Sequence, residues 1–163
     1  MDDITKSDIE SSFNRVEKIL RCGIFSPENM EHPLVQSALT ELLIRVRDLM
    51  EKAKIYAGAV DFTDDVNITD RVKNVSEAIA FVRNAICHID SENHYYEECN
   101  ARISYTFAYG QVNLISIGDV QIRSKYEDDV CFFFGSQKLY LKRHIVRAYE
   151  EAKKKLIPIM NKV

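Results

Sequence analysis

The sequence predicts an α+β protein: mainly a helical bundle, with a small antiparallel β-sheet inserted before the last helix. Two observations support this class. Four segments, residues 8–22, 33–57, 70–89 and 137–157, carry apolar side chains every three or four positions, which is the period of an amphipathic helix. Between the third and fourth segments, residues 102–134 alternate apolar and polar side chains with a period of two, as a β-strand does.

Residues that cap or stop helices set the bounds of these elements. The first helix is expected to stop at Gly23 and the second at Gly58, because glycine is common just past a helix C-terminus. Ser136 is expected to cap the last helix. Pro158 is expected to end it, because proline cannot continue the backbone hydrogen bonds.

The third helix has the clearest apolar period in the chain. Its apolar residues recur at intervals of three and four, at Val72, Val75, Ile79, Val82, Ile86 and Ile89. Before it, the acidic pair Asp64-Asp65 fits either a hard-cation site or a solvated loop leading into a helix N-terminus. The sequence leaves both interpretations of this pair open.

The inserted sheet begins with the clearest alternation in the chain. Ile103, Tyr105 and Phe107 alternate with small or polar residues, which predicts a strand with these three side chains facing inward. Glycines at 110 and 118 mark turns, and the apolar run at residues 130–134 predicts a further strand.

Composition limits the classes of protein to consider. With 163 residues, of which 46% are hydrophobic, residues 1–163 are expected to form a single domain. The net charge of −3 excludes a basic surface overall, so a nucleic-acid partner would need a local patch. The four cysteines are dispersed without zinc-site spacing and are expected to be reduced thiols in a cytoplasmic protein. No apolar run is long enough to span a membrane, and no metal or other cofactor is predicted.

Three polar residues lie together near the end of the third predicted helix: Arg83, Asn84 and His88. They fall outside the apolar stripe, and Asn84 and His88 are one turn apart on one face. A structural interpretation is also open, since a histidine near a helix C-terminus interacts well with the helix dipole. The same face carries Ala80 and Phe81, and this half-apolar character predicts contact with a second copy of the chain.

The motif resembles the signature of the HEPN superfamily, in which four to six residues separate an arginine, often followed by asparagine, from a histidine on a bundle helix. Arg83, Asn84 and His88 match it position by position. The resemblance rests on this motif, and the inserted sheet is not part of the minimal all-helical domain. It implies metal-independent RNA cleavage by a homodimer, in a toxin or defence effector with an antitoxin or nucleotidyltransferase partner. One subgroup carries a modified tyrosine two residues after the histidine, where this chain has Asp90.

The residue types suit RNA cleavage, because RNA carries its own nucleophile, the ribose 2′-hydroxyl. Histidine titrates near neutral pH, so His88 can accept the proton of this hydroxyl. Arg83 offers planar donors to the phosphate oxygens, and Asn84 can hold the imidazole or a phosphate oxygen. The alternative is a non-catalytic HEPN-like module that binds nucleotide, RNA or a protein partner through the same groove.

Basic residues outside the motif are candidates for binding the RNA backbone. Arg123 and Lys125 lie on a predicted loop, and Lys142 and Arg143 belong to the most basic stretch of the last predicted helix. A merely solvated surface is the alternative interpretation for both pairs.

Overall fold

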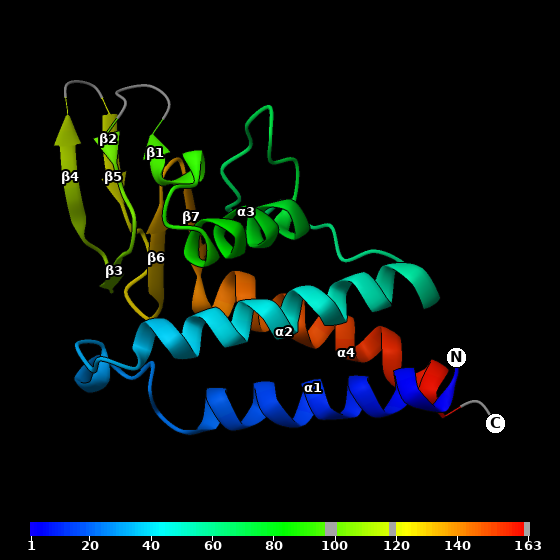
Figure 1. Cartoon of the computed structure of the whole chain (residues 1–163). Helices are drawn as coiled ribbons and strands as arrows, with labels where there is room; N and C mark the ends of the chain where they lie inside the picture. The colour runs from blue at the N-terminus through cyan, green and yellow to red at the C-terminus, as the bar shows by residue number, and fades with distance from the viewer. Residues whose placement is uncertain (97–100, 118–119, 162–163) are drawn as a thin grey trace. The chain divides into compact units, whose positions relative to one another are not determined.

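The structure, a computed structural model, describes residues 1–96, 101–117 and 120–161. Within these residues the chain forms four α-helices and three small antiparallel sheets, which confirms the predicted α+β class. The elements group into two compact units, Met1–Asp61 with Val146–Val163, and Phe62–Ile145. We call them the helical unit and the mixed unit (Figure 1). No helix among the described residues is long and apolar enough to cross a membrane.

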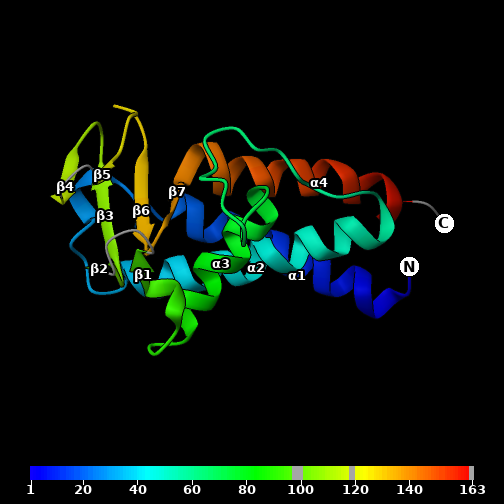
Figure 2. The same cartoon turned by 90° about the horizontal axis from the view of Figure 1, so that it is seen from above.

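The helical unit contains α1 (Asp3–Arg21), the short η1 (Pro27–Asn29), α2 (Val35–Tyr56) and α4 (Arg147–Met160). α2 packs against both α1 and α4, and these helices run alongside one another (Figure 2). The predicted second helix, residues 33–57, is confirmed to within two residues. The first helix begins earlier than residue 8, because the Asp2 side chain caps it by accepting a hydrogen bond from the Thr5 N–H at 2.8 Å.

α4 continues past Pro158 to Met160, so the predicted end before this proline is wrong. Pro158 is exposed in the last turn, and the N–H of Asn161 still donates to the Ile157 carbonyl at 3.2 Å. A proline removes one backbone hydrogen bond, and in the last turn few further bonds depend on it. Leu156 is fully buried, so the packing of this face also favours a continuous helix.

The mixed unit contains α3 (Val75–Cys87) and a set of short antiparallel strands. β3 (Thr106–Tyr109), β6 (Val130–Phe134) and β7 (Gln137–Tyr140) form one sheet in the order β3-β6-β7. The other pairs are β1 (Tyr95–Tyr96) with β2 (Ala101–Arg102), and β4 (Asn113–Ile117) with β5 (Val120–Arg123). β6 lies between two strands and is buried throughout, and α3 packs against β7 (Figure 1).

Gln137–Tyr140 form a strand, so the predicted last helix of residues 137–157 begins too early and the sheet extends beyond residue 134. Gly135 has a positive φ of 51°, and with Ser136 it makes the two-residue turn that joins β6 to β7. Ser136 therefore lies in a hairpin turn and does not cap a helix. The helical part starts later, as a π-helical turn, η3 (Leu141–Val146), that leads into α4.

The side chains predicted to face inward from the first strand are buried to different extents. Ile103 is buried as predicted, although it precedes β3. Tyr105 and Phe107 are half-buried, and their ring centroids lie 5.8 Å apart. Within β3 the buried residue is Ala108, at 7% exposure. β3 is an edge strand, and its buried side is the one that the alternation assigned to solvent.

α3 is shorter at both ends than the predicted 70–89. Asn74 caps its start by accepting a hydrogen bond from the Glu77 N–H at 3.0 Å, and the Glu77 carboxylate accepts from the N–H that precedes Asn74 at 2.6 Å. Val72 lies in the loop before α3 and is fully buried. Its apolar side chain therefore matched the helical period in the sequence although the residue is not helical. At the other end, His88 has an extended backbone with φ −132° and ψ 103°.

Three of the cysteines lie in the described residues and are free thiols: Cys22 and Cys87 are exposed, and Cys131 is buried. Cys99, and the turn predicted at residues 118–119, lie outside the described residues.

Candidate active site

The motif residues lie at the C-terminal end of α3. Arg83 and Asn84 are in its last turns, and Arg83 Nη1 donates to Asn84 Oδ1 at 2.8 Å. His88 is the first residue past the helix, so the prediction that it lies within the helix is wrong. Asn84 and His88 are exposed, while Arg83 is half-buried. The arginine and asparagine side chains are therefore hydrogen-bonded to each other, and the histidine lies just past the C-terminus of the helix.

The backbone of His88 is held from both sides. Its N–H donates to the carbonyls of Asn84 and Ala85 at 3.1 and 3.3 Å. Its carbonyl accepts from the Ser91 N–H and from Nε2 of His94, both at 3.0 Å. Within the part of the chain that the structure describes, the imidazole of His88 makes no hydrogen bond or ion pair. His88 thus presents an unengaged side chain on a fixed backbone.

The turn η2 (Glu92–His94) closes the end of α3. Asn93 Nδ2 donates to the Phe81 carbonyl at 3.1 Å, and Arg71 donates to Asn93 Oδ1 at 2.5 Å. His94 is only 5% exposed, and its Nε2 carries the proton because its partner, a carbonyl, can only accept. Sequence reasoning missed these supporting residues, because no periodicity marks side chains that reach a helix end from separate loops.

Phe81 is buried within its own chain, at 6% exposure. The Arg71 guanidinium lies over its ring, 5.3 Å from the centroid. The expectation that Phe81 offers apolar surface to a second copy of the chain is therefore wrong. The large apolar side chain exposed beside His88 is Ile89, at 78%.

The guanidinium of Arg83 is incompletely satisfied. Its Nε is buried and has no hydrogen-bond partner among the described residues. A buried donor without an acceptor costs about 1–3 kcal/mol, so this side chain gains by turning toward an anion. Arg102 differs, since it donates to the Ile89 carbonyl at 2.8 Å and to Ser104 Oγ at 3.0 Å. Arg102 therefore supports the segment after the motif.

Lys142 and Arg143, predicted to bind RNA, are paired with carboxylates. Arg143 lies 2.8 Å from Asp128 and 3.1 Å from Asp129, and its guanidinium stacks 3.7 Å from the Tyr126 ring centroid. Lys142 Nζ lies 3.7 Å from Asp128. These contacts neutralise much of the charge that makes this stretch basic in the sequence, and RNA binding by these two residues stays a prediction.

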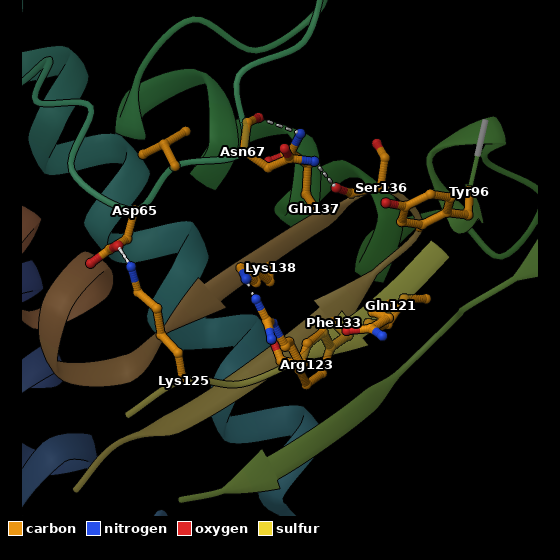
Figure 3. A pocket seen from close by; sticks show the side chains of 13 residues that line it. Asp65, Asn67, Tyr96, Gln121, Arg123, Lys125, Phe133, Ser136, Gln137 and Lys138 are labelled. Carbon is orange, nitrogen blue, oxygen red and sulfur yellow. Dashed lines mark hydrogen bonds and ion pairs between the residues drawn. The ribbon is translucent and has the colours of Figure 1, made fainter. Parts of the chain in front are cut away.

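Arg123 and Lys125, also predicted to bind RNA, line a cavity of about 310 Å³ in the mixed unit (Figure 3). Lys125 is paired with Asp65, which also accepts a hydrogen bond from the Tyr126 hydroxyl. Burial would raise the pKa of Asp65, but the hydrogen bonds from Lys125 and Tyr126 outweigh it and hold this pKa below its usual value. Asp65 is therefore engaged by two donors of its own chain. Among residues 1–96, 101–117 and 120–161, no group of three or more His, Cys, Asp or Glu side chains is placed to hold a metal ion.

Comparison of this chain with models of protein families, with curated proteins and with solved structures finds no match.

Proposed function

We propose that this chain is a metal-independent endoribonuclease of the HEPN type, with Arg83, Asn84 and His88 as its catalytic residues. The observation that carries the proposal is the contrast at His88. Hydrogen bonds fix its backbone at both the N–H and the carbonyl, while its imidazole is exposed and has no partner among the described residues. A catalytic base must be positioned and open to substrate, and His88 combines a fixed backbone with an exposed imidazole.

The proposed reaction uses the 2′-hydroxyl of the RNA as the nucleophile. His88 accepts the proton of this hydroxyl as its oxygen bonds to phosphorus, and the bond from phosphorus to the 5′-oxygen breaks. Arg83 donates to the phosphate oxygens as negative charge builds on them, and Asn84 holds Arg83 through the 2.8 Å hydrogen bond. The products are a 2′,3′-cyclic phosphate and a 5′-hydroxyl end. The reaction needs no cofactor.

The departing 5′-oxygen needs a proton, and the motif supplies one histidine per chain. We therefore include a homodimer in the proposal, with the motif of the second copy supplying the second proton-transfer group. The exposed side chain of Ile89, directly after His88, places apolar surface at this point. The proposal also includes a cytoplasmic location and, for a toxin or defence effector, a neutralising antitoxin or nucleotidyltransferase partner. One HEPN subgroup has a modified tyrosine two residues after the histidine, and this chain has Asp90 there. The proposal therefore does not include modification at that position.

A non-catalytic binding module is the second candidate. One observation favours it: within the described residues, no titratable side chain from outside the motif forms a hydrogen bond or ion pair with the side chains of Arg83, Asn84 or His88. Such a site could bind a phosphate through Arg83 and yet lack a route for the second proton.

The test is cleavage of labelled RNA by the purified chain in the presence of EDTA. The wild type should cleave and leave a cyclic phosphate, and His88→Ala should lose a factor of about 10² to 10⁴ in rate. His32→Ala is the matched control, because His32 is also an exposed histidine but lies in the helical unit. Equal cleavage by wild type and His88→Ala would identify a contaminating nuclease and end the enzymatic proposal. RNA that binds but is not cleaved by the wild type, with binding lost in Arg83→Ala, would support the binding module.

A further inference from the structure

The mixed unit has a hollowed basic surface that the proposed active site does not use. A cavity of about 310 Å³ opens between β5, the turn from β6 to β7, and the loop that carries Asp65 and Asn67 (Figure 3). Its polar lining includes three cationic side chains, Arg123, Lys125 and Lys138, against one carboxylate, Asp65. The whole chain has a net charge of −3, whereas the charged side chains that line this cavity are mainly positive. A local excess of positive charge in a cleft attracts anionic ligands.

The three cations are not equally engaged. Lys125 is paired with Asp65, and Lys138 Nζ donates to the Arg123 carbonyl at 3.3 Å and lies 5.9 Å from the Tyr140 ring centroid. The Arg123 side chain is exposed and has no hydrogen bond or ion pair among the described residues. Its guanidinium is therefore available to bind a phosphate through two parallel hydrogen bonds. Lys138 and Arg123 lie next to each other in Figure 3, so both residues line the same part of the cavity.

The opposite wall is built from amide groups with fixed orientations. Gln137 is 1% exposed, and its Nε2 donates to the Asn67 carbonyl at 2.9 Å, which fixes the orientation of the amide because that carbonyl can only accept. Its Oε1 is then buried without a partner among the described residues. Asn67 Nδ2 donates in turn to the Ser136 carbonyl at 2.6 Å. The wall therefore contains a buried acceptor that has no partner among the described residues.

A second cavity of the same volume, about 310 Å³, adjoins the first. Its lining includes Gln111, Val112 and Asn113 near the start of β4, and it shares Gln121, Arg123 and Lys125 with the first cavity. Arg123 and Lys125 thus line both cavities. One phosphate would occupy a single position here, whereas two adjoining hollows suit a ligand that continues on both sides of a phosphate.

We propose that this surface binds a single-stranded nucleic acid, with one phosphodiester at Arg123 and Lys138 and the flanking nucleotides in the two cavities. The site is separate from Arg83, Asn84 and His88, and the proposal holds whether or not the chain cleaves RNA. Asp65 limits the affinity, because its carboxylate neutralises Lys125 and repels phosphate. A strand that binds must compete with this ion pair.

The experiment is a binding titration followed by fluorescence anisotropy, with a labelled short oligothymidylate as the probe. This probe lacks the 2′-hydroxyl, so it cannot be cleaved by the proposed mechanism, and failure of the nuclease proposal leaves the measurement intact. Arg123→Ala should weaken binding about tenfold, which corresponds to the loss of one charged hydrogen-bonding group. The slope of log K against log salt concentration should fall in magnitude by about 0.7 for the lost phosphate contact. Lys154→Ala, which removes an exposed cation from α4, is the charge-matched control and should bind as the wild type does.

Asp65→Asn gives the opposite expectation. Asparagine tolerates the positive φ of 60° at this position, so the loop should keep its conformation. Binding should become several-fold tighter, because the substitution removes one negative charge and releases Lys125. Unchanged binding in both Arg123→Ala and Asp65→Asn would overturn the site. Equal affinity for thymidine monophosphate, inorganic phosphate and the oligothymidylate would contradict binding of a nucleic-acid strand and would show a site for phosphate alone.

Discussion

At the scale of single residues, histidines of this chain have opposite environments. His88 is exposed, and its imidazole has no partner among the described residues. His144 is fully buried, its Nδ1 accepts from the Tyr140 N–H at 3.2 Å, and its Nε2 donates to the Asp64 carbonyl at 3.0 Å. A buried imidazole with both nitrogens engaged in this way is held in one neutral tautomer and serves the fold.

His144 predicts an acid-dependent loss of stability. Burial lowers its pKa below the usual histidine value, although the Asp64 carbonyl and the charges of Asp65 and Asp129 act in the other direction and Lys138 adds to the lowering. The unfolded chain therefore binds a proton near pH 6.5 while the folded chain does not. The free energy of unfolding should fall as the pH drops below about 6.5, by at most about 1.4 kcal/mol per pH unit, until the folded-state pKa is reached.

Urea unfolding at a series of pH values measures this effect. His144→Gln should be less stable at neutral pH but should lose this part of the pH dependence. His32→Gln removes an exposed histidine and should keep it. The same pH dependence in wild type and His144→Gln would contradict the assignment to His144.

Arg83 and Asn84 should contribute unequally to catalysis. Arg83→Ala removes the group that touches the phosphate and should lower kcat by about 10² to 10³. Asn84→Ala removes the hydrogen bond that holds Arg83 and should cost less, since the guanidinium remains. Arg83→Ala should not lower Tm, because it also removes the buried Nε that has no partner in the described chain. Rate and Tm measured on the same preparations check this, and a larger rate loss for Asn84→Ala would reverse the two roles.

At the scale of secondary-structure elements, the end of α3 is supported by the hairpin of β6 and β7 through η2. The Gly135 N–H donates to the Ile103 carbonyl at 2.8 Å, and the Ile103 N–H donates to the His94 carbonyl at 2.7 Å. His94 in turn holds the carbonyl of His88. The position of the proposed base therefore depends on a turn that lies far from it in the sequence.

Gly135→Ala tests this support. A Cβ at Gly135 would lie 2.3 Å from the Asn93 carbonyl oxygen and 2.8 Å from that of Tyr95, so the segment that carries His94 would have to move. We expect a loss of about 1–3 kcal/mol from overpacking, in addition to about 1–2 kcal/mol for a side chain at positive φ. RNA cleavage should fall as well, because the backbone of His88 loses its fixed position.

Gly23→Ala is the matched control for this substitution. Gly23 also has a positive φ, 77°, but an added Cβ would meet no atom within 4 Å. Gly23→Ala should therefore lose only the stability that a side chain at positive φ costs, as measured by urea unfolding. Its RNA cleavage should equal that of the wild type. Equal stability losses for the two variants would show that the contact with the Asn93 segment is not tight.

At the scale of the whole molecule, the nuclease proposal requires two copies of the chain with their motifs facing each other. The interface should include Asn84, His88 and Ile89, which are exposed at the end of α3. Light scattering at micromolar concentration should give the mass of a dimer. Ile89→Asp should shift it to that of a monomer and abolish cleavage, because a carboxylate would be buried without a partner in the interface.

Ile4→Asp is the control for the dimer measurement. Ile4 is exposed to a similar extent, 76% against 78% for Ile89, but lies at the start of α1. It should leave both the mass and the cleavage rate unchanged. A monomeric wild type that still cleaves RNA would remove the second copy from the mechanism.

Sequence patterns alone predict the α+β class, the helices α1 and α2, and the polar motif near the end of α3. Helices and strands with one buried face impose a strict apolar period, and that period is a local property that can be read without coordinates. The motif was also visible locally, because Arg83, Asn84 and His88 fall within six consecutive positions and lie outside the apolar stripe of their helix.

Three features depend on the folded chain: where α3 ends, that Gln137–Tyr140 form a strand, and which cations have no carboxylate partner. Val72, and Leu139 and Tyr140 of β7, are buried by distant partners, so their apolar character could not distinguish helix from loop or strand. Charge is likewise a pairwise property in a folded chain. Arg143 meets Asp128 and Asp129 through the fold, whereas Arg123 has no carboxylate partner among the described residues. Two residues equally basic in the sequence are thereby given different electrostatic environments.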